Sequence, residues 1–117
     1  MGKLVRFDLA ALPAEDAGPA PDRILAGAPR ASFKLAAEHA GGKLSAGLWE
    51  SSPGRWRVAY TEWEFFHVLR GACELIGDDG ERQVLHAGDA LVVEPGFTGE
   101  FAVLEPMAKY FVVYTAE

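Results

Sequence analysis

Glycine-containing turns cut most of this chain into short apolar segments, and their spacing constrains the fold more than any other feature. Ten of the thirteen glycines lie between Gly41 and Gly99. The runs between them are rich in Val, Phe, Tyr and Trp, which suit a pleated, half-buried strand. We place these runs at residues 46–50, 55–60, 64–69, 72–76, 82–85, 90–93, 100–104 and 109–114. Many short strands at this spacing predict an all-β antiparallel sandwich or barrel, of which the jelly roll is one form.

Turn-forming residues separate the predicted strands. Gly77-Asp-Asp-Gly80 is typical of a hairpin loop, because Asp and Gly tolerate a left-handed backbone. His86-Ala-Gly-Asp89 and Pro95-Gly-Phe-Thr-Gly99 indicate two further tight turns. We expect Asp89 to stabilise its own turn through a bond from the backbone to its side chain.

The first thirty residues differ in composition from the rest, because they hold four of the seven prolines. Proline fixes φ and lacks a backbone N–H, so this stretch is neither a central strand nor a long helix. Two interpretations stay open, an extended arm that wraps the domain or a partner subunit, and a loosely ordered terminus. We therefore divide the chain into an N-terminal arm (1–30) and a single barrel (31–117), a size that can form a core without staples.

Residues 31–40 contain neither Gly nor Pro, and their local propensity favours a helix that Gly41-Gly42 would end. An edge strand is the alternative.

Composition excludes several classes of partner. A net charge of −6 with scattered Lys and Arg argues against nucleic acid. No apolar stretch approaches the length of about 18 residues that a membrane span needs. Cys73 is the single cysteine, so it forms no internal disulfide, which favours a reducing compartment. Because the first twelve residues also lack a signal-peptide layout, we expect a cytoplasmic protein.

Two motifs resemble those of the cupin family. Glu64-Phe-Phe-His-Val-Leu-Arg-Gly71 resembles the second half of the first cupin motif, and Gly88-Asp-Ala-Leu-Val-Val-Glu-Pro-Gly96 resembles the second, with Glu94 where that motif usually has proline. Together with Gly47-Leu-Trp-Glu50 and Lys109-Tyr-Phe-Val-Val-Tyr114, they are similar to the ureidoglycine aminohydrolase and ethanolamine-utilisation cupins over residues 24 to 115. The resemblance implies an RmlC-like jelly-roll β-barrel, and a strand around residues 33–37.

The resemblance also bears on metal binding, since most cupin enzymes hold a divalent metal on three histidines and a glutamate. The histidine positions fall on Val58, on Tyr60 and on or near Gly99, and only the glutamate, Glu64, is present. A lone carboxylate does not hold a transition metal. We therefore expect no cofactor; a metal held by Glu64 and His67 would need a strand bulge that turns His67 into the barrel.

Residues 58, 60 and 64 share parity, so on one extended strand they face the barrel lumen together. A desolvated Glu64 suits general acid–base catalysis, and a purely structural glutamate bonded to Tyr60 or Lys109 is the alternative. Three tryptophans (Trp49, Trp56, Trp63) and several phenylalanines, Phe65 among them, supply the aromatic residues of the core and mouth. The candidate ligand-binding residues are Tyr60, Glu62, Glu64, Phe66, Phe101 and Lys109.

Three functions compete at this point. The first is a small-molecule-binding cupin without metal chemistry. The second is an enzyme that uses Glu64 as acid or base on a small polar metabolite, amino, ureido or sugar-like. The third is an interaction module that forms a homodimer and leaves its lumen unused. The resemblance to cupins, together with the benefit of covering sheet edges in a small barrel, favours a homodimer.

Overall fold

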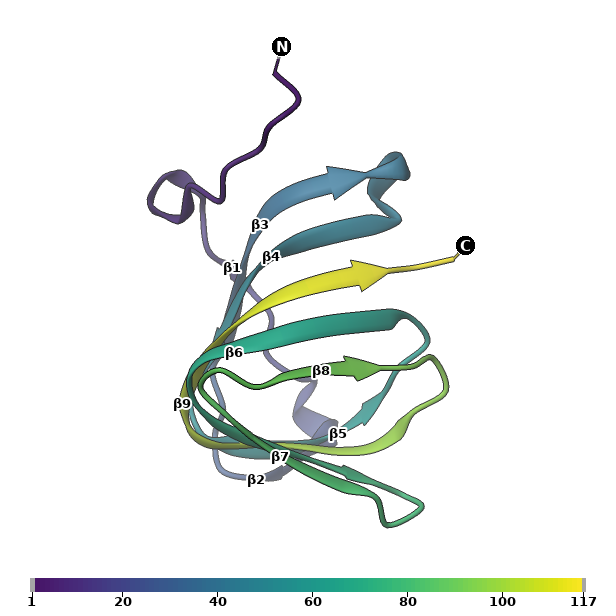
Figure 1. Ribbon diagram of the computed structural model, residues 1–117. Helices are drawn as coiled ribbons and strands as arrows, with labels where there is room; N and C mark the ends of the chain where they lie inside the picture. Colours follow the sequence, from purple (N-terminus) through teal and green to yellow (C-terminus); the bar gives the residue numbers. More distant parts are fainter. Residues whose placement is uncertain (1, 117) are drawn as a thin grey trace.

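Two long strands, β6 (Trp63–Gly77) and β9 (Thr98–Tyr114), run antiparallel through the middle of the molecule and bend together (Figure 1). The protein is seen here in a computed structural model that describes residues 2–116. The other strands are β1 (Glu15–Asp16), β2 (Ile24–Ala26), β3 (Ala31–His39), β4 (Leu44–Ser51), β5 (Gly54–Ala59), β7 (Arg82–His86) and β8 (Ala90–Val93). Three short 3-10 helices complete the order: η1 (Leu9–Ala11), η2 (Pro21–Arg23) and η3 (Ala40–Gly42).

Because β6 and β9 bend, each contributes to two facing sheets. The first sheet holds β1, β3, β4, the second half of β9, the first half of β6, and β8. The second holds β2, β5, the first half of β9, the second half of β6, and β7. All of these pairings are antiparallel, and the prediction of an all-β jelly roll is confirmed.

The bend corrects the expectation of separate strands at residues 64–69 and 72–76, and at 100–104 and 109–114. Gly71 does not end its strand; it adopts a φ of +81° within β6. A Cβ on Gly71 would collide with the Pro106 carbonyl of β9, so the two backbones approach closely there. The ladder between β6 and β9 shifts register in this region, and Pro106 falls in a gap where no partner needs its missing N–H.

Residues 31–39 form a strand, so the helix that local propensity favours does not form. β3 pairs with β4 along almost its whole length, and η3 at residues 40–42 turns the chain between them. Burial explains the outcome, because Phe33 and Leu35 reach the space between the sheets only from a strand.

The proline-rich arm follows the surface of its own domain. β1 pairs with β3, and β2 pairs with β5, so the arm adds a short strand to each sheet. Between β1 and β2, Ala17 and Pro19 cross the opening between the sheets. Residues 2–6 project from the domain (Figure 1), and Leu4 is 96% exposed, whereas Phe7 packs edge-on against Tyr110.

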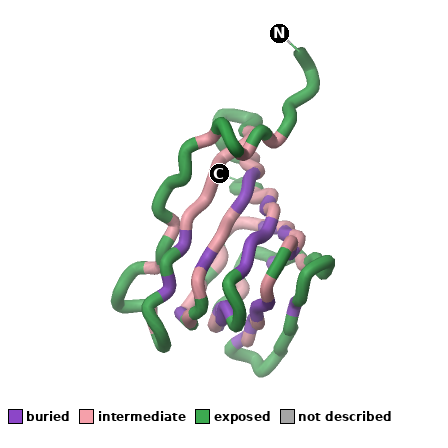
Figure 2. The backbone as a smooth tube through the Cα atoms, turned by 90° about the vertical axis from the view of Figure 1, so that its left-hand side faces the viewer, coloured by how far each residue is buried: buried purple, intermediate pink, exposed green. Residues whose placement is uncertain are grey.

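Side chains alternate between the two faces of the central strands, so buried and partly exposed positions follow one another (Figure 2). The inward face forms a core that includes Phe66, Val68 and Met107. The outward face of the first sheet is also apolar. It carries Trp63, Phe65, Val92, Tyr110, Val112 and Tyr114, which we call the outer apolar face. Trp63 and Phe65 therefore lie outside the barrel, contrary to their expected place in the core and mouth.

Candidate functional site

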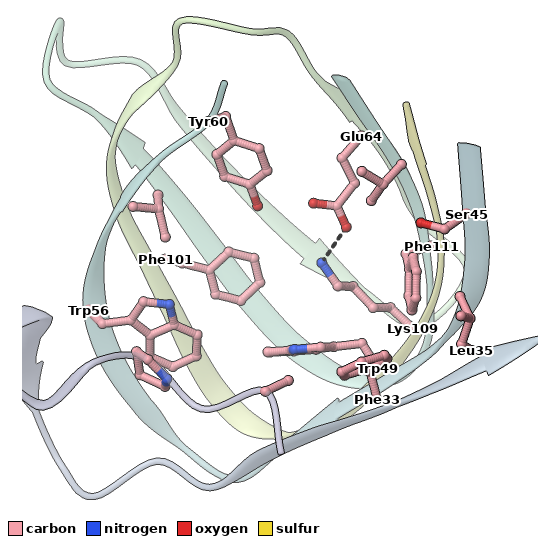
Figure 3. A pocket seen from close by; sticks show the side chains of 14 residues that line it. Phe33, Leu35, Ser45, Trp49, Trp56, Tyr60, Glu64, Phe101, Lys109 and Phe111 are labelled. Atoms are coloured by element: carbon pink, nitrogen blue, oxygen red, sulfur yellow. Dashed lines mark hydrogen bonds and ion pairs between the residues drawn. The ribbon is translucent and has the colours of Figure 1, made fainter. Parts of the chain in front are cut away.

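A cavity of about 340 Å³ lies between the two sheets, beneath the arm. Strands β3, β4, β5, β6 and β9 contribute its walls, and Ala17 and Pro19 of the arm lie at its opening. Its other lining residues are Phe33, Leu35, Ser45, Trp49, Trp56, Val58, Tyr60, Glu64, Phe101, Lys109, Phe111 and Val113 (Figure 3). Most of them are apolar, and the few polar groups gather on one wall.

A buried salt bridge forms the polar wall. The Lys109 Nζ lies 3.0 Å from the Glu64 Oε2, and the two side chains are 5% and 10% exposed. Glu64 of β6 pairs with Val113 of β9, and Lys109 lies four residues before Val113 on the same face. Strand alternation therefore aims both charged groups inward.

Aromatic rings surround the Lys109 ammonium. Its Nζ lies 4.0 Å from the centroid of Phe66, 4.9 Å from that of Trp49 and 5.2 Å from that of Phe101. A cation over an aromatic face gains about 0.5–2 kcal/mol, more where water is excluded. These contacts and the Glu64 carboxylate together offset part of the desolvation cost of the buried ammonium.

Tyr60 directs its hydroxyl into the cavity near Glu64 (Figure 3). Burial, followed by the negative charge of Glu64, raises the pKa of Tyr60 well above its ordinary value. The phenol therefore stays protonated and can donate a hydrogen bond to Glu64 or to a ligand. The Tyr60 backbone is held on both sides, since its N–H donates to the Phe97 carbonyl and its carbonyl accepts from the Gly96 N–H.

The second sheet contributes an aromatic wall, and Trp49 of the first sheet, the cross-strand neighbour of Lys109, adds its ring to the same cavity. The rings of Trp56 and Phe101 stack with their centroids 5.4 Å apart, and Trp49 meets Phe101 edge-on at 5.7 Å. Such large, rigid surfaces suit the packing of a flat, apolar group.

The structure brings four of the predicted site residues together around the cavity: Tyr60, Glu64, Phe101 and Lys109. Phe66 lies behind the Lys109 ammonium, fully buried, and does not line the cavity. Glu62 lies outside it, in an adjoining depression at the barrel mouth, where its carboxylate accepts a hydrogen bond from the Thr61 N–H.

Val58, Tyr60 and Glu64 face the cavity together, but they do not share one strand as the parity prediction assumed. Val58 and Glu64 lie on different strands, β5 and β6, and Tyr60 lies in the turn between them. All three still line one cavity, because β5 and β6 both border it.

The residues present do not fit a cupin-type metal site. Among residues 2–116 no three or more His, Cys, Asp or Glu side chains cluster so as to hold a metal ion. The Lys109 ammonium already neutralises Glu64, and a Cβ at Gly99 would collide with the Ile76 carbonyl. His67 lies on the outward face: the ladder from Glu64 to His67 is regular, so no bulge turns it inward.

Five further cavity residues were not predicted from the sequence: Phe33, Leu35 and Ser45, with Ala17 and Pro19 of the arm. Their positions depend on how β3, β4 and the arm fold over the barrel. The apolar alternation of Phe33 and Leu35 is the one local signal that could have identified two of them.

A jelly roll with a cavity that opens between two antiparallel sheets is the architecture of a cupin. The chain belongs to the EutQ-like cupin domain family, whose model matches residues 38–111. No curated protein matches it.

Solved structures agree with this assignment of the fold. An ethanolamine utilization protein Q of Salmonella typhimurium is 19% identical with a TM-score of 0.66, over 75% of this chain and 72% of that one. The EutQ protein of Clostridium difficile is 19% identical with a TM-score of 0.65, over 76% of this chain and 65% of that one. A protein of unknown function from Pseudomonas syringae pv. tomato is 18% identical with a TM-score of 0.78, and the match covers 88% of this chain and 45% of that one. Within residues 2–116 no helix is long and apolar enough to cross a membrane.

Proposed function

We propose that this chain is a small-molecule-binding cupin that works without the three-histidine metal site of most cupin enzymes. The observation that supports the proposal is the cavity of about 340 Å³, in which a few polar groups face aromatic walls. Ligand pockets generally combine an apolar lining with a small number of fixed polar groups. Tyr60, Glu64 and Lys109 would orient the ligand, and Trp49, Trp56 and Phe101 would pack against it.

A thermal-shift screen of amino, ureido and sugar-like compounds tests this proposal, with and without divalent ions. A ligand at a hundred times its Kd stabilises the folded state by about 2.7 kcal/mol. Val58→Phe would fill the cavity without removing a polar group, so it should abolish the stabilisation. Val92→Phe, on the outer apolar face, is the matched control and should retain it. Equal stabilisation of wild type and Val58→Phe would place the ligand elsewhere and refute the proposal.

Catalysis by Glu64 is the second candidate function. The Tyr60 hydroxyl and the Lys109 ammonium both adjoin the Glu64 carboxylate, and this favours proton transfer to or from a bound ligand. If the protein is an enzyme, a compound from the panel should be converted to product by wild type and by Val92→Phe, and remain unchanged with Glu64→Gln. Turnover that persists in Glu64→Gln would exclude this role.

A further inference from the structure

The charges of the cavity cancel within the protein itself. Among the described residues that line it, Glu64 and Lys109 are the charged ones, and they pair at 3.0 Å. Tyr60 adds no charge, because its phenol stays protonated. Other ionic groups near the opening, Arg23, Arg57 and Glu62, line the adjoining open depression, where water screens them, and Arg57 is already paired with Asp78.

We propose that this cavity selects an uncharged, ring-bearing molecule, and that the salt bridge between Glu64 and Lys109 is what excludes ions. The inference rests on the proposed binding function and names its ligand class. A carboxylate entering the cavity would lose its hydration, and the Lys109 ammonium is already paired with Glu64. A cation would lose its hydration too, and the Glu64 carboxylate is already paired with Lys109. Either ion would have to break the buried salt bridge or stay without a charged partner. A cation would gain only the contact with the aromatic faces, and burying a charge without a charged partner is costly in free energy.

The walls set the shape of the ligand. Trp56 and Phe101 are stacked, with an interplanar angle of 21°, and Trp49 lies against the Phe101 ring. A flat ring can pack on these surfaces. The Tyr60 hydroxyl and the Glu64 carboxylate face the same space (Figure 3), and Ser45 contributes a further hydroxyl to the lining. A hydroxyl or amide on the ring would satisfy these groups without adding charge.

The size of the cavity is compatible with such a molecule. Its volume of about 340 Å³ is roughly ten times the share of one water molecule in the liquid, which is about 30 Å³. A single ring with one polar substituent therefore fits.

Probes of similar shape and different charge test the inference: benzamide and benzyl alcohol are neutral, benzoate is an anion, and benzylamine is a cation at pH 7. Binding is measured by calorimetry and by the indole N–H signals of Trp49 and Trp56. Wild type should bind at least one neutral probe at least tenfold more tightly than either ion. Benzoate or benzylamine binding as tightly as the neutral probes would overturn the ligand class and leave the binding function intact.

Two single variants should each shift binding toward one of the two ions. Glu64→Gln leaves the ammonium unpaired, so benzoate should gain at least tenfold over benzamide relative to wild type. Lys109→Met leaves the carboxylate unpaired, so benzylamine should gain by a similar factor. The double variant Glu64→Gln/Lys109→Met removes both charges and should keep the neutral preference, and it is informative even if a single variant fails to fold. If none of the probes binds wild type, the proposed ligand class fails, and the thermal-shift screen decides the binding function. If Val58→Phe binds the probes as tightly as wild type does, they bind outside the cavity, and the proposed function fails together with the inference.

Discussion

Replacing Lys109 by Met keeps a long, flexible side chain and removes the charge that neutralises Glu64. Because the Glu64 side chain is only 10% exposed, its carboxylate cannot regain full hydration. It then either stays charged, at a cost of about 3–5 kcal/mol, or takes up a proton. Protonating an ordinary glutamate costs about 1.36 kcal/mol for each pH unit above 4.3, which gives about 3.7 kcal/mol at pH 7 and about 1 kcal/mol at pH 5.

Protonation of Glu64 therefore limits how much unfolding free energy the variant loses, and this loss must depend on pH. The folded variant favours the protonated carboxyl, so its stability falls as pH rises from about 5 to 7. Urea unfolding at both values measures the free energy directly, and we expect Lys109→Met to lose up to about 3.7 kcal/mol at pH 7 and about 1 kcal/mol at pH 5.

Two further variants isolate the cause. Arg70→Met removes the cation from an exposed salt bridge with Glu50, where the side chains are 62% and 38% exposed, and should cost no more than about 1 kcal/mol at either pH. Glu64→Gln/Lys109→Met should recover most of the stability lost in the single variant, because no buried charge remains. A loss in Lys109→Met below about 1 kcal/mol at pH 7, or one that does not change between pH 5 and 7, would refute the reasoning.

Three other predictions follow from separate features. Burial raises the pKa of the Cys73 thiol to about 11, so about one molecule in a thousand carries the thiolate at pH 8. Iodoacetamide should therefore label Cys73 only after urea unfolds the chain, and rapid labelling of the folded protein would contradict this. Gly71→Ala should destabilise by at least about 2 kcal/mol, because it combines a positive φ with a collision against the Pro106 carbonyl. Gly80→Ala, with a φ of +94° in open space, should cost about 1 kcal/mol, and equal losses in urea unfolding would show that the close approach is unimportant. The homodimer expected from the sequence predicts that Phe65→Lys, on the outer apolar face, lowers the mass measured by light scattering toward the 12.6 kDa of one chain; a wild-type protein that is monomeric at high concentration would exclude the homodimer.

The sequence by itself determined the features that depend on short-range periodicity. Glycine marked several of the turns, although not at Gly71, and the hairpin at residues 77–80 formed where it was predicted. The Asp89 side chain accepts a hydrogen bond from the backbone of His86, as the turn chemistry indicated. Alternation along β6 aimed Glu64 into the lumen and His67 away from it, because a period of two residues belongs to the strand itself.

Only the tertiary structure decided which chain segments surround Glu64. Residues 31–39 became a strand against their helical propensity because pairing with β4 places the half-buried Phe33 and Leu35 in the cavity wall. Lys109 lies 45 positions from Glu64, and no local pattern distinguishes it from a surface lysine; the register between β6 and β9 places it beside the carboxylate. Contacts between distant strands depend on register and on how the sheets face each other, and neither is encoded in any short stretch of sequence.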